Sequence, residues 1–304
     1  MNLHSWLFSL IAVLASAAGA QQSAADPEIA PYLNATPAFS RAVAPSTHFD
    51  GPLQAQAVGT YSITLQQGQA VTIRLLQQTG EIGAISIDPQ KRASAIRIND
   101  SGKGAALRFT LIASETGSYE IRVRCLSTSK DCQLAMNSSE LRQATASDSR
   151  LMSAEEAVAG GDKLAKSAAT ESRAAAARAF DQALSTAGDL HDDWLSHHIL
   201  YLKARLALRS QQYAQARDLM LQATRMAEPA DDIPASAVCW KVLGYSYAYL
   251  GELDHALSAY AQARALYVKS ADAMNEEILD ENSARAHRAM GENDLALEDR
   301  KSVV

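Results

Sequence analysis

The sequence lacks the motifs on which common catalytic sites are built. Its 304 residues contain no Gly-x-Ser-x-Gly element, no glycine-rich phosphate loop and no cysteine in a context typical of a Cys-His dyad. The chain has three cysteines and seven histidines, and none follows the His-Glu-x-x-His or paired-cysteine spacing of a metal site. We therefore expect no enzyme activity, no cofactor and no bound metal.

An excess of positive charge is also missing. Lys and Arg number 28 against 34 Asp and Glu, so the formal net charge is -6. Binding to nucleic-acid phosphates requires a clustered basic face, and nucleic acid is therefore not an expected partner. The chain is 47% hydrophobic and 20% charged. This composition is typical of a globular protein, and the length is sufficient for two domains of ~150 residues each.

Apolar runs long enough to span a membrane are absent as well. The run over residues 6–15 is followed by the small residues Ala18 and Ala20, which is typical of a signal peptide over residues 1–20. A membrane anchor is the alternative, but a spanning helix needs about 20 apolar residues. The start of the chain lacks Lys and Arg, unlike most signal peptides, and no cysteine follows that could carry a lipid. We expect a periplasmic or secreted protein that is not inserted in the membrane after cleavage.

The first half of the mature chain has the alternation of β-strands. Residues 21–48 are rich in Ala, Pro, Ser and Gln and are predicted as a linker. Residues 49–138 then alternate between apolar and polar side chains, and residues 61–65 and 71–75 are predicted to form a hairpin. Short strands and turns of this kind predict an antiparallel β-sandwich. The predicted strands are residues 61–65, 71–75, 85–87, 96–98, 107–111, 119–123 and 133–136.

The cysteines acquire a meaning if the chain is exported. Cys125 and Cys132 flank a polar turn between two predicted strands, so we expect them to pair across a hairpin in an oxidising compartment. Two unpaired thiols are the alternative. Cys239 remains, and a buried structural thiol is the reading we favour for it.

Residues 113–123, Ala-Ser-Glu-Thr-Gly-Ser-Tyr-Glu-Ile-Arg-Val, join a glycine turn to a strand that begins with tyrosine. This motif resembles bacterial pre-peptidase C-terminal-like domains, which are β-sandwich modules that flank exported enzymes or serve in binding. The resemblance implies no catalytic residue in this part of the chain.

After a linker over residues 139–152, the composition shifts to helix formers, and residues 153–304 repeat with a period of forty. Small and large residues recur in register, and a turn glycine recurs at Gly251 and Gly291, where the earlier units carry Glu171 and Gln211. The period predicts stacked helical hairpins, and an alanine-rich bundle whose small residues recur by composition alone is the alternative. The columns are Ala176, Ala216, Ala256 and Ala296; Ala183, Ala223 and Ala263; and Phe180, Met220 and Tyr260.

The unit over residues 237–270 has the clearest pattern. Small residues would let two helices approach, aromatic residues would fill the space between them, and a glycine would end the first helix. The pattern resembles a tetratricopeptide repeat, which implies a protein-binding array, although Val268 stands where that family has proline. The positions that carry the resemblance are Trp240, Leu243, Gly244, Tyr247, Gly251, Ala256, Tyr260 and Ala263.

In tetratricopeptide proteins the first helix of each repeat lines the inner face of the array. By this resemblance we expect a protein or peptide partner, bound through aromatic and cationic side chains that suit an acidic or carboxylate-ended peptide. An ordinary solvated surface is the alternative. The corresponding positions are Tyr201, Arg205, Lys241, Tyr245, Glu281 and Arg285.

Residues 191–198 collect potential metal ligands or acid-base groups, including His191, Asp192, Asp193, His197 and His198. They fall at the expected start of a helix, where aspartate commonly caps the free N–H groups. Capping is the interpretation we favour.

The order of signal peptide, β-sandwich and tetratricopeptide helices resembles the N-terminal portion of exported bacterial proteins that end in a caspase-like CHAT peptidase domain. Residues 299–304 also read like a translated sequencing adapter, so we expect the natural protein to continue beyond about Glu298. Two hypotheses follow. The chain is a binding scaffold of the cell envelope, or it is the regulatory, substrate-presenting part of a longer peptidase.

Overall fold

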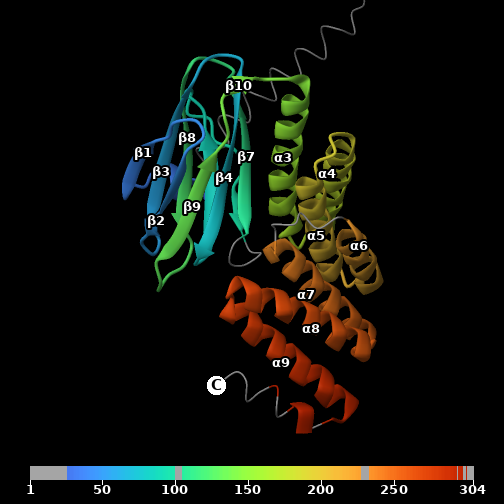
Figure 1. Ribbon diagram of the computed structural model, residues 1–304. Coiled ribbons are helices and arrows are strands. Elements are labelled where there is room, and N and C mark those ends of the chain that lie inside the picture. The colour runs from blue at the N-terminus through green and yellow to red at the C-terminus, as the bar shows by residue number, and fades with distance from the viewer. Residues whose placement is uncertain (1–25, 100–104, 227–232, 293, 297–298, 300–304) are drawn as a thin grey trace, which may run out of the picture. The chain divides into compact units, whose positions relative to one another are not determined.

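A computed structural model describes residues 26–99, 105–226, 233–292, 294–296 and 299 (Figure 1). The predicted signal peptide and nearly all of residues 297–304 lie outside the described residues. The described part is mixed α+β, with sheets followed by helices, as the sequence predicts. It divides into two compact units between Thr145 and Ala146, and the short segments Leu76–Thr79 and Asn99–Ala106 group with the second unit.

The first unit contains two five-stranded sheets. One has the order β1 (Phe39–Ala42), β3 (Val58–Leu65), β8 (Gly117–Cys125), β5 (Ile82–Ile87) and β6 (Arg97–Asn99). The other has the order β10 (Arg142–Gln143), β4 (Gln69–Thr79), β9 (Cys132–Ser138) and β2 (His48–Leu53), with β7 (Ala106–Ile112) also paired to β4. One hydrophobic core takes side chains from both sheets. All the predicted strands coincide with, or overlap, strands of these sheets.

The predicted hairpin of residues 61–65 and 71–75 is wrong. These segments lie in β3 and β4, which belong to different sheets. The turn is present, with Gly68 at φ +84°, but the chain crosses from one sheet to the other there. Alternation identifies a strand with one buried face and leaves its neighbour undetermined. The pairing is also not antiparallel throughout, because β1 pairs with β3 in parallel.

The disulfide has a different setting from the one expected. Cys125 ends β8 and Cys132 begins β9, and the two are bonded with a Cα–Cα distance of 5.6 Å. Since β8 and β9 lie in different sheets, the bond joins the sheets and does not close a hairpin. Gly80 packs against it, because a Cβ at Gly80 would lie 2.6 Å from Cys132 Sγ.

The predicted linkers are shorter than expected. Within residues 21–48 the structure has α2 (Ala30–Leu33) and β1, and within residues 139–152 it has β10 and the start of a helix. Ile29 and Tyr32 form a small core with Ile85 and Ile87 of β5. Burial raises the pKa of the Tyr32 hydroxyl to about 12. A few apolar side chains thus hold a segment whose overall composition suggests a linker.

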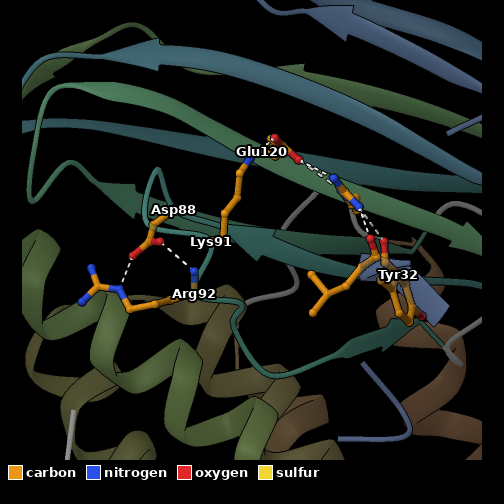
Figure 2. Close-up of polar contacts among 7 residues, drawn as sticks. Tyr32, Asp88, Lys91, Arg92 and Glu120 are labelled. Atoms are coloured by element: carbon orange, nitrogen blue, oxygen red, sulfur yellow. Dashed lines mark hydrogen bonds and ion pairs between the residues drawn. The ribbon is translucent and has the colours of Figure 1, made fainter. Parts of the chain in front are cut away.

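Polar contacts also hold this N-terminal segment (residues 26–34), and Figure 2 shows them. Arg122 Nη1 donates hydrogen bonds of 2.9 Å to the carbonyls of Tyr32 and Leu33. Glu120 accepts from Arg122 Nε at 3.0 Å and from Lys91 Nζ at 2.8 Å. Burial acts to raise the pKa of Glu120, but these hydrogen bonds outweigh it and the pKa is lowered. The ionised carboxylate therefore favours the folded state above its usual pKa, and this contribution is lost as the pH falls through the lowered value.

Replacing Arg122 with alanine is expected to release the N-terminal segment while the sheets stay folded. Losing a charged donor to two carbonyls costs about 1.5–3 kcal/mol, so chymotrypsin should cleave after Tyr32 or Leu33 roughly tenfold faster or more. Lys91→Ala is the control, because Lys91 contacts Glu120 and not the segment. Unchanged cleavage of Arg122→Ala would mean that the apolar contacts of Ile29 and Tyr32 are sufficient.

The second unit is an array of helices in which each packs against the next. The helices are α3 (Ala146–Ala165), α4 (Thr170–Asp189), α5 (Asp193–Arg209), α6 (Tyr213–Arg225), α7 (Ile233–Leu250), α8 (Leu253–Ser270) and α9 (Ala273–Met290). Gln211, Gly251 and Gly291 have φ of 59°, 78° and 82° and end α5, α7 and α9. The predicted period therefore marks equivalent turns. Glu171 is an exception, since it lies inside α4.

The columns of small and large residues lie on α4, α6 and α8. Ala176, Ala216 and Ala256 are each 0% exposed, which places them at equivalent buried positions in successive hairpins. Phe180, Met220 and Tyr260 are buried in the same core, as are Ala183, Ala223 and Ala263. The forty-residue period is thus a period of the fold.

Candidate functional site

The helical unit contains a groove of about 770 Å³. Helices α5 to α9 all contribute to it, and its lining includes the small residues Ala248, Ala286 and Ala289. No aspartate or glutamate is among the described residues that line it. The polar and aromatic lining consists of Arg209, Gln211, Tyr213, Tyr245, Tyr249, Tyr260, Asn282 and Arg285.

Four tyrosines form two ring pairs in this groove. Tyr213 and Tyr249 stack with centroids 4.6 Å apart and planes inclined by 7°, and Tyr245 meets Tyr260 edge to face at 5.9 Å. Tyr245 and Tyr249 are four residues apart on α7 and therefore lie on one face of that helix. Tyr249 is open to solvent, since 65% of the residue is exposed.

Glycine at position 244 allows this arrangement. A Cβ at Gly244 would lie 2.3 Å from Tyr260 Cε1, so the ring of Tyr260 occupies the space that any other residue would fill. The sequence predicts a small residue here for close approach of two helices, and the structure shows a ring lying against the glycine. Burial raises the pKa of Tyr260 and of Tyr245, so both hydroxyls stay protonated at neutral pH.

The charge in the groove is cationic. Arg285 on α9 lies at the surface and contacts Glu281 Oε1 at 2.5 Å through Nη2. Asn282 Nδ2 donates to Tyr245 Oη at 3.3 Å, which fixes the tyrosine beside Arg285. Arg209 Nη1 donates to the Ala165 carbonyl at 3.3 Å. The groove thus offers aromatic faces and arginine side chains, and the carboxylate of Glu281 contacts one of these arginines, Arg285, although Glu281 is not among the described lining residues.

The structure separates the five aromatic and cationic residues predicted to bind a partner. Tyr245 and Arg285 line the groove, whereas Tyr201, Arg205 and Lys241 do not. Tyr201 belongs to the hydrophobic core and is 7% exposed, with the Arg205 guanidinium 5.4 Å from its ring centroid.

The side chain of Lys241 also makes contacts within the helical array. Its Nζ donates to Asn275 Oδ1 at 2.7 Å and lies 5.4 Å from the ring centroid of Tyr267. Side chains at equivalent positions of the repeat therefore differ in how deeply they are buried. The periodicity predicts which face of the helix they lie on, but it does not predict which of them remain exposed to solvent.

The repeat-packing residues are mostly in the core. Leu243, Gly244 and Tyr260 are buried, while Trp240 and Tyr247 are half-buried against the same core. Tyr213 and Tyr249 also line the groove, and the sequence analysis did not predict them as binding residues. The spacing of Tyr249 four residues after Tyr245 was an available signal, but the stacking of Tyr213 from the preceding hairpin was not.

The histidine-rich start of α5 is explained by capping and packing. Asp192 Oδ1 accepts from the Leu195 amide at 2.9 Å, which confirms the predicted cap. His198 stacks on Trp194 with centroids 5.5 Å apart. Cys239 is a buried thiol, as predicted, and its Sγ lies 3.3 Å from His197 Nε2, a contact that the sequence did not suggest.

The described residues contain neither a cluster of metal ligands nor a membrane-spanning helix. Nowhere in that part of the chain do three His, Cys, Asp or Glu side chains group so that they could hold a metal ion. None of its helices has both the length and the apolar character to cross a bilayer.

No family model matches the chain, and no curated protein matches it. Solved structures of several proteins resemble parts of it, among them the three that follow. Aspartyl phosphate phosphatase F from Bacillus subtilis is 14% identical, covering 52% of this chain and 41% of that one, with a TM-score of 0.44. PliG from Aeromonas hydrophila, a periplasmic inhibitor of g-type lysozyme, is 18% identical over 35% of this chain and 100% of that one, with a TM-score of 0.28. The pre-peptidase C-terminal domain of a Bacillus anthracis collagenase is 12% identical over 33% and 93%, with a TM-score of 0.26. These similarities are too low to assign the chain to a family.

Proposed function

We propose that this protein is an interaction scaffold of the cell envelope and not an enzyme, and that its groove binds a segment of a partner protein. The observation that carries the proposal is the tyrosine stack of Tyr213 and Tyr249, which shares a groove of about 770 Å³ with Arg285; no acidic residue is among the described residues of its lining. Tyrosine and arginine are enriched among the few residues that carry most of the binding energy in protein interfaces. The groove has both.

The lining favours a partner segment with a carboxylate. A ligand carboxylate could accept charge-assisted hydrogen bonds from Arg285, which are roughly twice as strong as neutral ones. In the free protein Glu281 occupies this guanidinium at 2.5 Å. An acidic ligand must therefore compete with Glu281 for the guanidinium. Removing the charge of Arg285 should lower the affinity, and removing the charge of Glu281 should raise it.

The finer interpretations belong to the same proposal. The two sheets with a shared core support a β-sandwich of the pre-peptidase C-terminal-like type, and the buried forty-residue columns support tetratricopeptide-like hairpins. The inter-sheet disulfide supports an oxidising location, periplasmic or extracellular.

Opposite effects are expected from the two charge variants. Arg285→Gln should weaken binding of acidic peptides by about tenfold or more, because a charged hydrogen bond is worth about 1.5–3 kcal/mol. Glu281→Gln should strengthen binding severalfold, because it frees Arg285. Peptides selected from a displayed random library by the intact chain would be titrated against each variant by fluorescence polarisation.

Arg217→Gln is the matched control. Arg217 lies on α6, is paired with Asp218 at 3.0 Å and Glu252 at 3.1 Å, and does not line the groove. Its substitution should leave the affinity unchanged. Equal affinities for all three variants would place the binding surface elsewhere, and a library without any binder would remove the proposed function.

The second candidate function is the regulatory part of a longer CHAT-type peptidase, in which the helices would present substrates to the catalytic domain. The order of the two units, sheets before helices, favours it. Sequencing the gene downstream of the codon for Glu298 tests it, since an open frame with peptidase His and Cys motifs is expected and a natural stop codon would exclude it.

A further inference from the structure

An exposed histidine connects the edge strand β2 to its neighbour β9. In the described part of the chain β2 ends its sheet, and β9 is the strand paired with it (Figure 1). His48 begins β2 and lies directly opposite Asn137 of β9. His48 Nδ1 is 2.5 Å from Asn137 Oδ1, and His48 Nε2 is 2.7 Å from Asp50 Oδ2. Both ring nitrogens of His48 therefore face an oxygen atom.

This arrangement of two oxygen acceptors is fully satisfied by the protonated ring. A neutral imidazole carries one N–H, so its other nitrogen would direct a lone pair at one of the two oxygens. The imidazolium carries two N–H groups and can donate to Asn137 and Asp50 at once. Its charge also lies against the Asp50 carboxylate, and charge-assisted hydrogen bonds are stronger than neutral ones. Protonation of His48 therefore strengthens the connection between the start of β2 and β9.

The far end of β2 is held by contacts that do not involve His48. Leu53 is 1% exposed and belongs to the core of the two sheets. Just beyond it, the amide of Ala55 donates to Asp131 Oδ1 at 3.0 Å. The side chains of His48 and Asp50 are each 55% exposed. An effect of pH through His48 is therefore confined to the first residues of the strand.

We propose that His48 is a pH-sensitive latch on the edge of this sheet, closed when the imidazole is doubly protonated and open when it is neutral. The closed latch keeps the first residues of β2 paired with β9, and the open latch lets them fray. An edge strand presents unpaired backbone groups to which another chain can add, so its attachment affects association as well as stability. The latch lies in the sheet unit and does not depend on the groove or on the proposed function.

The pKa of His48 agrees with this geometry. The hydrogen bond with Asn137 and then that with Asp50 raise the pKa of His48 above its usual value of 6.5. Asp50 is the charged group among the described residues that acts on this ring. Since the folded state binds the proton more tightly than the unfolded state, the latch is fully formed below the usual pKa. It is lost as the pH rises through the raised pKa.

Hydrogen exchange of the intact chain tests the latch, with rates corrected for the intrinsic pH dependence of exchange. Between about pH 5.5 and about pH 8.5, the protected amides of residues 47–50 should lose protection by roughly twofold to fivefold, the range expected for an exposed ion pair. The amides of β3, which lies in the other sheet, should keep their protection.

A histidine variant assigns the effect to this ring. His48→Gln cannot titrate, so its residues 47–50 should have the same protection at both pH values, at the level that the wild type reaches at the higher pH. His255→Gln is the matched control, because His255 is also exposed but lies on α8 of the helical unit. It should behave as the wild type does.

Nitrogen NMR of the His48 ring gives a second readout. At about pH 6.5 an ordinary histidine is half protonated, and His48 should be protonated on both nitrogens in more than half of the molecules. A mostly neutral ring at this pH would overturn the proposal, and it would follow if the Asn137 amide were turned so that its NH₂ group donates to the ring. Protection of residues 47–50 that does not change with pH, or that falls equally in His48→Gln, would also overturn it.

Discussion

Replacing Phe180 with alanine is expected to destabilise the helical unit by about 3–5 kcal/mol, the usual cost of removing a buried aromatic ring. Phe180 on α4 is 0% exposed. Its ring packs against α3, where a Cβ at Gly161 would lie 2.7 Å from Phe180 Cε1. The glycine and the ring are therefore complementary, and alanine at position 180 would leave a cavity between α3 and α4.

Tryptophan fluorescence during urea unfolding measures this loss. The chain has three tryptophans, of which Trp194 and Trp240 lie in the helical unit and Trp6 precedes the predicted cleavage site. In the mature protein the emission therefore reports the helices alone. Phe180→Leu is the control and should cost less than about 1.5 kcal/mol. A loss below about 1 kcal/mol for Phe180→Ala would contradict the packing described here.

Removing the disulfide should destabilise the sheet unit by about 2.5 kcal/mol. This value follows from the chain entropy released when a loop of this size opens, since the bonded cysteines are seven positions apart. Both cysteines are 0% exposed and contribute to the core of the two sheets. The double variant Cys125→Ala with Cys132→Ala should thus unfold its sheets at lower urea concentration while the tryptophan transition stays in place.

The resistance of the sheet unit to chymotrypsin would follow the sheets. Cys239→Ala is the control, because Cys239 lies in the helical unit and should leave the sheet transition unchanged. A double variant within about 0.5 kcal/mol of the wild type would show that strand packing alone holds the sheets at their β8–β9 connection.

Local patterns predicted the elements of this fold better than their partners. Alternation located strands β3 and β4, because each buries one face, but the neighbour of a strand is decided by contacts distant in sequence. The same limit applies to Cys125 and Cys132. Their spacing suggested a bond, and only the sheet order shows that it joins two sheets.

The helical repeat was predictable because it is periodic. Ala216 and Ala256 occupy equivalent buried positions, since each hairpin meets its neighbours in the same way. The groove breaks this equivalence. Arg205 and Tyr245 occupy equivalent positions on successive first helices, forty residues apart, yet Tyr245 lines the groove and Arg205 does not. Tyr213 reaches Tyr249 from another hairpin, and no short-range spacing encodes that contact.

Photocrosslinking from the groove tests the central claim most directly. A photoreactive benzoylphenylalanine would replace Tyr249, which is 65% exposed in the groove, or Val268, which is 53% exposed on α8 and outside it. Both chains would be irradiated with the peptides selected from the library. The account predicts crosslinks to the peptides from position 249 and none above background from position 268. Equal crosslinking from the two positions, or crosslinking from 268 alone, would contradict it.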